Sequence, residues 1–156
     1  MIDLPLRAFR INGNNGTEKI ELTINEIFDF PERTSIEGGY DFKGDLIICV
    51  GSYEARFKDF FSSTGILYEL LTSLTSCYNS LDGVAEYKHL YEGDFRFTLK
   101  MTSLGHTIIE GVFQEYPHLS NKLIFEMTTD QTCILNAINE LKQVERLFGD
   151  NKGKLN

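Results

Sequence analysis

The sequence predicts an α+β fold: a single domain, residues 1–149, in which a curved and mainly antiparallel β-sheet of about seven to eight strands carries two amphipathic helices. Most segments alternate apolar and polar residues with a period of two, and two segments instead have a helical period. The turns between the predicted strands are too short for parallel crossovers. The 156 residues are 42% hydrophobic, enough for one substantial core. The polar residues 150–156 are predicted to form a frayed tail.

Strict alternation indicates half-buried strands at three places. In residues 18–24 (EKIELTI), Ile20, Leu22 and Ile24 share one face, and residues 94–101 and 121–128 follow the same rule. These segments should have one face in the core and one in water.

Other strands are predicted from apolar content and position. Residues 45–50 and 106–116 are apolar on both faces and should lie near the middle of the sheet. Shorter strands are expected at 5–12, 53–60 and 84–90. Proline at position 5 places the first strand at an edge, because proline donates no hydrogen bond to a neighbouring strand.

Two segments have the period of a helix. Residues 63–81 repeat leucines at spacings of three and four before Gly83, and residues 130–148 carry an apolar stripe that ends before Gly149. The candidate N-cap residues are Ser63 or Thr64 for the first helix and Thr129 or Asp130 for the second.

Negative charge is concentrated in two acidic segments. The net charge is −8, and residues 26–45 and 82–94 contribute −4 and −3 of it. Such a surface repels phosphate backbones, so direct nucleic-acid binding is not expected. The chain start lacks the pattern of a signal peptide and no apolar run is long enough to cross a membrane, which predicts no membrane association and a cytoplasmic location.

Residue patterns for catalysis or metal binding are not found. Gly38 and Gly39 lead into a strand through acids, so they indicate a turn with Tyr40 on the sheet, not a phosphate loop. The sequence therefore predicts no catalytic residue, metal or cofactor. The isolated cysteines Cys49, Cys77 and Cys133 are expected as buried thiols in a reducing compartment, and the histidines His89, His106 and His118 as surface or turn residues.

Four stretches together resemble a known family. They are GGYDFKGDLIICVGSYEARF, STGILYELLTSLTSCYNSLDGVAEY, GHTIIEGVFQE and NKLIFEMTTDQTCILNAINEL. In their order and spacing, over residues 36–148, they are similar to the WapI-type immunity proteins of bacterial polymorphic toxin systems. The resemblance implies a small cytoplasmic protein that binds and occludes the toxic C-terminal domain of a cognate toxin, commonly a nuclease. It supplies no catalytic residue.

An acidic surface suits such a partner, because a toxin that acts on RNA or DNA needs a basic groove. We therefore expect the two acidic segments to form part of the surface that contacts the toxin. The candidate contact residues are Glu37, Asp41, Asp45, Glu86, Glu92 and Asp94.

Two alternatives stay open at this stage. The curved sheet could enclose a small-molecule site, with carboxylates such as Glu110 or Glu126 as general acid or base if burial raises their pKa values. The stripe of Phe95, Phe97, Phe125 and Met127 could line such a cavity, although core packing is the favoured interpretation. An exposed sheet edge could instead serve assembly. A cleft in the curved sheet would favour a ligand site, whereas a completely filled interior would show that these residues form a core.

Overall fold

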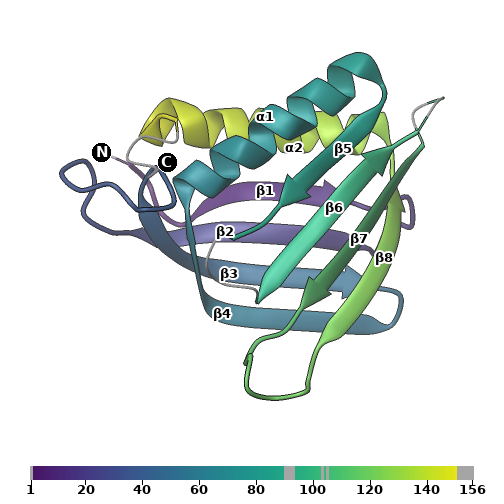
Figure 1. Ribbon diagram of the computed structural model, residues 1–156, viewed down its shortest axis with the longest axis horizontal. Coiled ribbons are helices and arrows are strands. Elements are labelled where there is room, and N and C mark those ends of the chain that lie inside the picture. The colour runs from purple at the N-terminus through teal and green to yellow at the C-terminus, as the bar shows by residue number, and fades with distance from the viewer. Residues whose placement is uncertain (1, 90–93, 103, 105, 151–156) are drawn as a thin grey trace.

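The chain folds into two four-stranded antiparallel sheets and two helices, as seen in a computed structural model that describes residues 2–89, 94–102, 104 and 106–150 (Figure 1). The predicted α+β class and both helices are confirmed, and the predicted curved sheet consists of two sheets. The first sheet contains β1 (Leu6–Asn12), β2 (Lys19–Ile27), β3 (Asp41–Val50) and β4 (Tyr53–Ser63). The second contains β5 (Gly83–Tyr87), β6 (Phe95–Met101), β7 (Thr107–Phe113) and β8 (Leu123–Thr129). The helices are α1 (Thr64–Ser80) and α2 (Gln131–Phe148).

Strands that follow one another in the chain are neighbours in each sheet. The orders are β1-β2-β3-β4 and β5-β6-β7-β8, and all these pairs are antiparallel. β1 is an edge strand, and β3 and β7 lie inside their sheets, as the sequence predicts. The second sheet lies in front of the first in Figure 1, and its strands cross those of the first at an angle.

The helices close one side of this two-layer arrangement. α1 packs against β5, α2 packs against β1, and the helices pack against each other. Ser63 is the N-cap of α1, where its side chain accepts a hydrogen bond from the Ile66 N–H. The C-cap of α1 is Leu81, in the left-handed conformation, two residues before the predicted stop at Gly83. The N-cap of α2 is Asp130 and its C-cap is Gly149, both at predicted positions.

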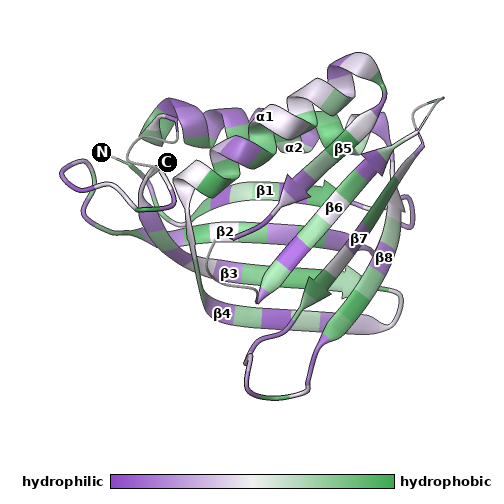
Figure 2. Ribbon diagram, viewed as in Figure 1, coloured by the Kyte–Doolittle hydropathy of each residue, from purple (hydrophilic) through white to green (hydrophobic). Residues whose placement is uncertain are grey.

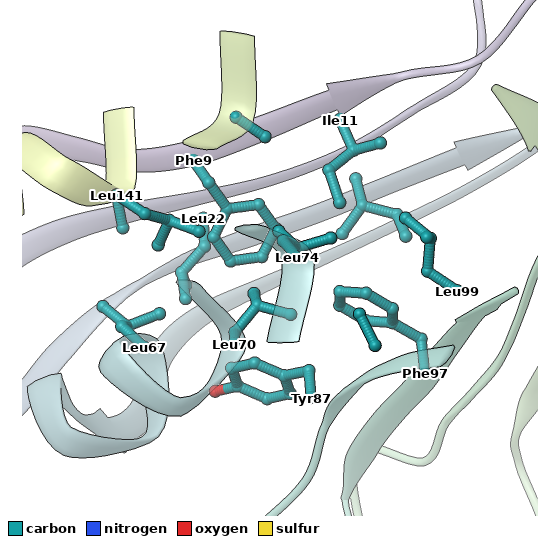
Figure 3. Packing of buried hydrophobic residues seen from close by; sticks show 14 of the residues in the cluster. Phe9, Ile11, Leu22, Leu67, Leu70, Leu74, Tyr87, Phe97, Leu99 and Leu141 are labelled. Carbon is teal, nitrogen blue, oxygen red and sulfur yellow. The ribbon is translucent and has the colours of Figure 1, made fainter. Parts of the chain in front are cut away.

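The core lies where the inner faces of both sheets meet the helices. Phe9 of β1, Tyr87 of β5 and Phe97 of β6 form a ring cluster with centroids 5.8 to 6.5 Å apart, and leucines of α1 pack beside it (Figure 3). Each fully buried side chain of this size stabilises the fold by about 2 kcal/mol. The period-two pattern is visible along β6 in Figure 2, where hydrophilic and hydrophobic positions alternate. The predicted stripe belongs to this core: Phe95, Phe97, Phe125 and Met127 are all buried.

The cysteines are free thiols of differing burial. Cys77 is buried as predicted, whereas Cys49 and Cys133 are only half-buried. Burial, together with the negative charge of Asp82, raises the pKa of the Cys77 thiol. This thiol is therefore protonated and a weak nucleophile near neutral pH.

Candidate partner-binding surfaces

The turn that carries Glu37 is held against the start of α1. The Thr64 N–H donates to the Tyr40 carbonyl at 2.9 Å, the Tyr40 N–H donates to Thr64 Oγ1 at 2.9 Å, and the Gly65 N–H donates to the Gly38 carbonyl at 3.2 Å. Gly38 and Gly39 have φ values of 93° and 64°, and Tyr40 is buried. The glycine pair therefore builds a turn, as the sequence predicts.

A buried histidine holds the Glu37 carboxylate. His89 Nδ1 lies 3.3 Å from Glu37 Oε2, and His89 Nε2 lies 3.4 Å from the Tyr87 hydroxyl. The Tyr87 hydroxyl in turn shares a 2.6 Å hydrogen bond with Ser62 Oγ. The expectation of a surface or turn position is wrong for His89, which is only 5% exposed. His106 and His118 are exposed.

This network borders a shallow cleft of about 210 Å³ at the end of the first sheet. We call it the Glu37 cleft. Its apolar wall is exposed: Ile36 is 55% and Phe61 is 42% accessible. Carboxylates beside exposed apolar groups suit a lysine or arginine side chain of a partner. The cleft is lined by Ser35, Ile36, Glu37, Asp41, Phe61, Ser62 and His89.

The structure divides the six predicted contact residues among several places. Glu37 and Asp41 meet at the Glu37 cleft. Asp45 lies on β3, half-buried beside Thr23 of β2, and Asp94 precedes β6. Glu86 projects from β5 into a different hollow. Glu92 lies outside the described residues.

That second hollow, of about 550 Å³, lies on the outer face of the second sheet. The cross-strand register places Glu86 beside Thr98, Thr98 beside Glu110, and Glu110 beside Glu126. Glu110 and Glu126 are exposed, so the burial required for the proposed general acid or base role is absent. Sequence alternation points these residues outward, but their adjacency depends on strand register, which the sequence does not show.

No group of three or more histidine, cysteine, aspartate or glutamate side chains within the described ranges is arranged to hold a metal ion. In the same part of the chain, neither helix combines the length and hydrophobicity needed to cross a membrane.

Comparison with known proteins identifies the family. The model of the immunity protein WapI-like family matches residues 10–149. The chain belongs to this family. The WapI-like assignment agrees with the resemblance seen in the sequence and indicates an immunity function.

Two further comparisons add little about residue roles in this WapI-like protein. No significant match is found among curated proteins. A chain from a solved structure titled "CdiA-CT/CdiI toxin and immunity complex from Enterobacter cloacae" is similar, with 16% identity and a TM-score of 0.41, covering 76% of this chain and 98% of that one. This level of similarity does not transfer contacts from one protein to the other.

Proposed function

We propose that this protein neutralises a cognate toxin domain by binding it in the cytoplasm and covering its working surface. The observation that carries the proposal is the family match over residues 10–149. The net charge of −8 supports a basic partner, and the C-terminal domain of a toxin that cleaves RNA or DNA would present one.

The described surface offers what a tight binder needs. Long-range attraction between opposite charges raises the association rate, and apolar anchors buried at the centre of an interface slow dissociation. The Glu37 cleft combines both elements, since Glu37 and Asp41 lie beside the exposed Ile36 and Phe61. For this reason we propose the two acidic segments, residues 26–45 and 82–94, as contact regions for the toxin.

Co-expression tests the proposal directly. The probe is the C-terminal domain of a candidate cognate toxin, sought as a large exported protein encoded immediately upstream, and it is produced in cells from an inducible promoter. We expect the domain alone to stop growth and the wild-type protein to restore it. An immunity protein of an unrelated toxin is the control and should not restore growth. Absence of rescue by the wild-type protein would contradict the proposal.

The stoichiometry of inhibition separates a binder from an enzyme. A binder must be present at about one molecule per toxin domain, whereas an enzyme that modified the toxin would protect at much lower ratios. Titration of purified protein against toxin activity should therefore give a break near equimolar amounts. Complete protection far below that ratio would favour the enzymatic alternative.

A further inference from the structure

The outer face of the second sheet has no covering element in the described structure. Its inner face meets the core, and the helices pack along one side of the molecule against β5 and β1. In Figure 1 the outer face of β6, β7 and β8 is turned toward the viewer and no helix crosses it. This face is therefore available to a partner.

Three unpaired carboxylates form a row across that face. Glu86, Glu110 and Glu126 make no ion pair or side-chain hydrogen bond with another described residue. Glu110 stands directly opposite Glu126 in the β7–β8 register. Like charges directly opposite each other destabilise a sheet, so the pair is unfavourable for the fold alone. A cation placed between the two carboxylates would remove that repulsion.

Within the bounds of the four strands, the bases of this face both project from β6. They are Arg96, which lines the same hollow as the three carboxylates, and Lys100. The outward positions of β7 and β8 carry only carboxylates, aliphatic side chains and one threonine: Ile108, Glu110, Val112, Ile124, Glu126 and Thr128. The half of the face on β7 and β8 is therefore acidic and apolar.

Aliphatic groups flank the carboxylates closely. Ile124 is 69% exposed and Ile108 is 36% exposed, and Ile124 is the cross-strand neighbour of Val112. Ile124 and Val112 border the 550 Å³ hollow, which is more than twice the volume of the Glu37 cleft. Exposed aliphatic side chains that cluster on a surface and are rimmed by polar residues mark candidate protein-interaction sites.

Resting on the proposed function, we infer that the β7–β8 outer face is the main docking surface for the toxin, and that it receives a protein surface with lysine or arginine set among apolar side chains. Charge complementarity selects this occupant. A second copy docked by a two-fold axis through the Glu110–Glu126 pair would bring four carboxylates together, and an anionic lipid surface would be repelled.

The test measures binding of the same toxin domain, with its activity removed by mutation, to variants of the full-length protein. The charge variant is Glu110→Lys with Glu126→Lys, and the apolar variant is Ile124→Asp. Glu145→Lys with Asp150→Lys, at the exposed end of α2, makes the same change in net charge elsewhere. Circular dichroism and urea unfolding first establish that each variant is folded. If the lysine pair disturbs folding, Glu110→Gln with Glu126→Gln replaces it.

We expect the charge variant to lower the association rate by about tenfold or more at low ionic strength, and Ile124→Asp to raise the dissociation rate. The α2 control should bind with rates close to those of the wild type.

If the wild type binds and both face variants bind equally well, the inference is wrong while the proposed function stands. If the wild type itself does not bind, the proposed function fails. A wild-type dimer that Ile124→Asp converts to monomer without loss of toxin binding would assign this face to self-association and overturn the inference.

Discussion

Asp130 combines two stabilising effects at the start of α2. Its carboxylate accepts a hydrogen bond from the Cys133 N–H at 2.9 Å, and it lies at the positive end of the helix dipole. That backbone hydrogen bond is the main reason why the pKa of Asp130 is below its ordinary value, although burial opposes the shift slightly. The ionised carboxylate therefore favours the folded state.

The sign of the pH dependence follows from the lowered pKa. The contribution of Asp130 is present above the unfolded pKa of about 3.9 and is lost as the pH falls through the lower folded value. We expect Asp130→Ala to reduce the free energy of unfolding by about 1 kcal/mol near neutral pH, and by less at about pH 3. Asp130→Asn keeps an acceptor oxygen and should cost little near neutral pH. Urea unfolding at both pH values measures this, and an equal loss at both would exclude the charge as the cause.

Single residues differ in how far the sequence predicts them. Asp130 could be found because a cap is defined by its immediate neighbours in the chain. His89 could not, because its partner Glu37 comes from a turn far away in the chain, and its other partner, Tyr87, is held by Ser62 of β4. Nδ1 of His89 lies beside Glu37 and Nε2 lies beside the Tyr87 hydroxyl, so both ring nitrogens have a polar partner although the ring is buried.

At the scale of elements, the contact between the 35–40 turn and α1 depends on small residues on both sides. A Cβ atom at Gly65 would lie 2.3 Å from the Gly38 carbonyl carbon, and one at Gly39 would lie 2.2 Å from Thr64 Oγ1. Both distances are far below van der Waals contact. Glycine at these positions lets two backbones approach closely enough to hydrogen-bond.

Helix propensity and packing make opposite predictions for Gly65→Ala. Propensity alone favours alanine in a helix by up to about 1 kcal/mol. The clash with the Gly38 backbone should outweigh it, so we expect a net loss of about 1–3 kcal/mol, as for overpacked cores. Gly16→Ala is the matched control, since nothing lies within 4 Å of the position that its new methyl group would take, and little change is expected. Urea unfolding compares the two variants, and a stabilised Gly65→Ala would contradict the close approach.

Strands and helices could be predicted because the spacing of apolar residues within each segment indicates its secondary structure. The alternation in β2 and β6 and the leucine spacing in α1 come directly from which faces are buried. The row of Glu86, Glu110 and Glu126 was not predictable, because it needs the registers of three strand pairs at once. One residue of slip would place any of these side chains on the opposite face.

At the scale of the whole molecule, α1 is the segment of the chain at which the first sheet ends and the second begins. It connects β4 of the first sheet to β5 of the second, and its 17 residues span about 25 Å. A meander that continued across this helix would give one sheet, and the chain pattern is the same in both cases. The sequence therefore predicts the α+β class and the antiparallel order of the strands, but it does not predict that the strands divide into two sheets. That division also distributes the acidic segments over separate surfaces.

The overall charge leads to a prediction about kinetics. If the toxin domain is basic, the field of a protein with net charge −8 accelerates encounter, and salt screens that field over about 10 Å at 0.1 M. We expect the association rate to fall steeply as ionic strength rises from about 0.01 M to about 0.5 M, while the dissociation rate changes much less. Stopped-flow fluorescence or surface plasmon resonance separates the two rates.

Apolar anchors such as Ile124 are insensitive to screening, so Ile124→Asp should change the dissociation rate at every salt concentration. An association rate independent of salt would show that charge does not guide this encounter, and would leave shape and apolar contact as the basis of recognition.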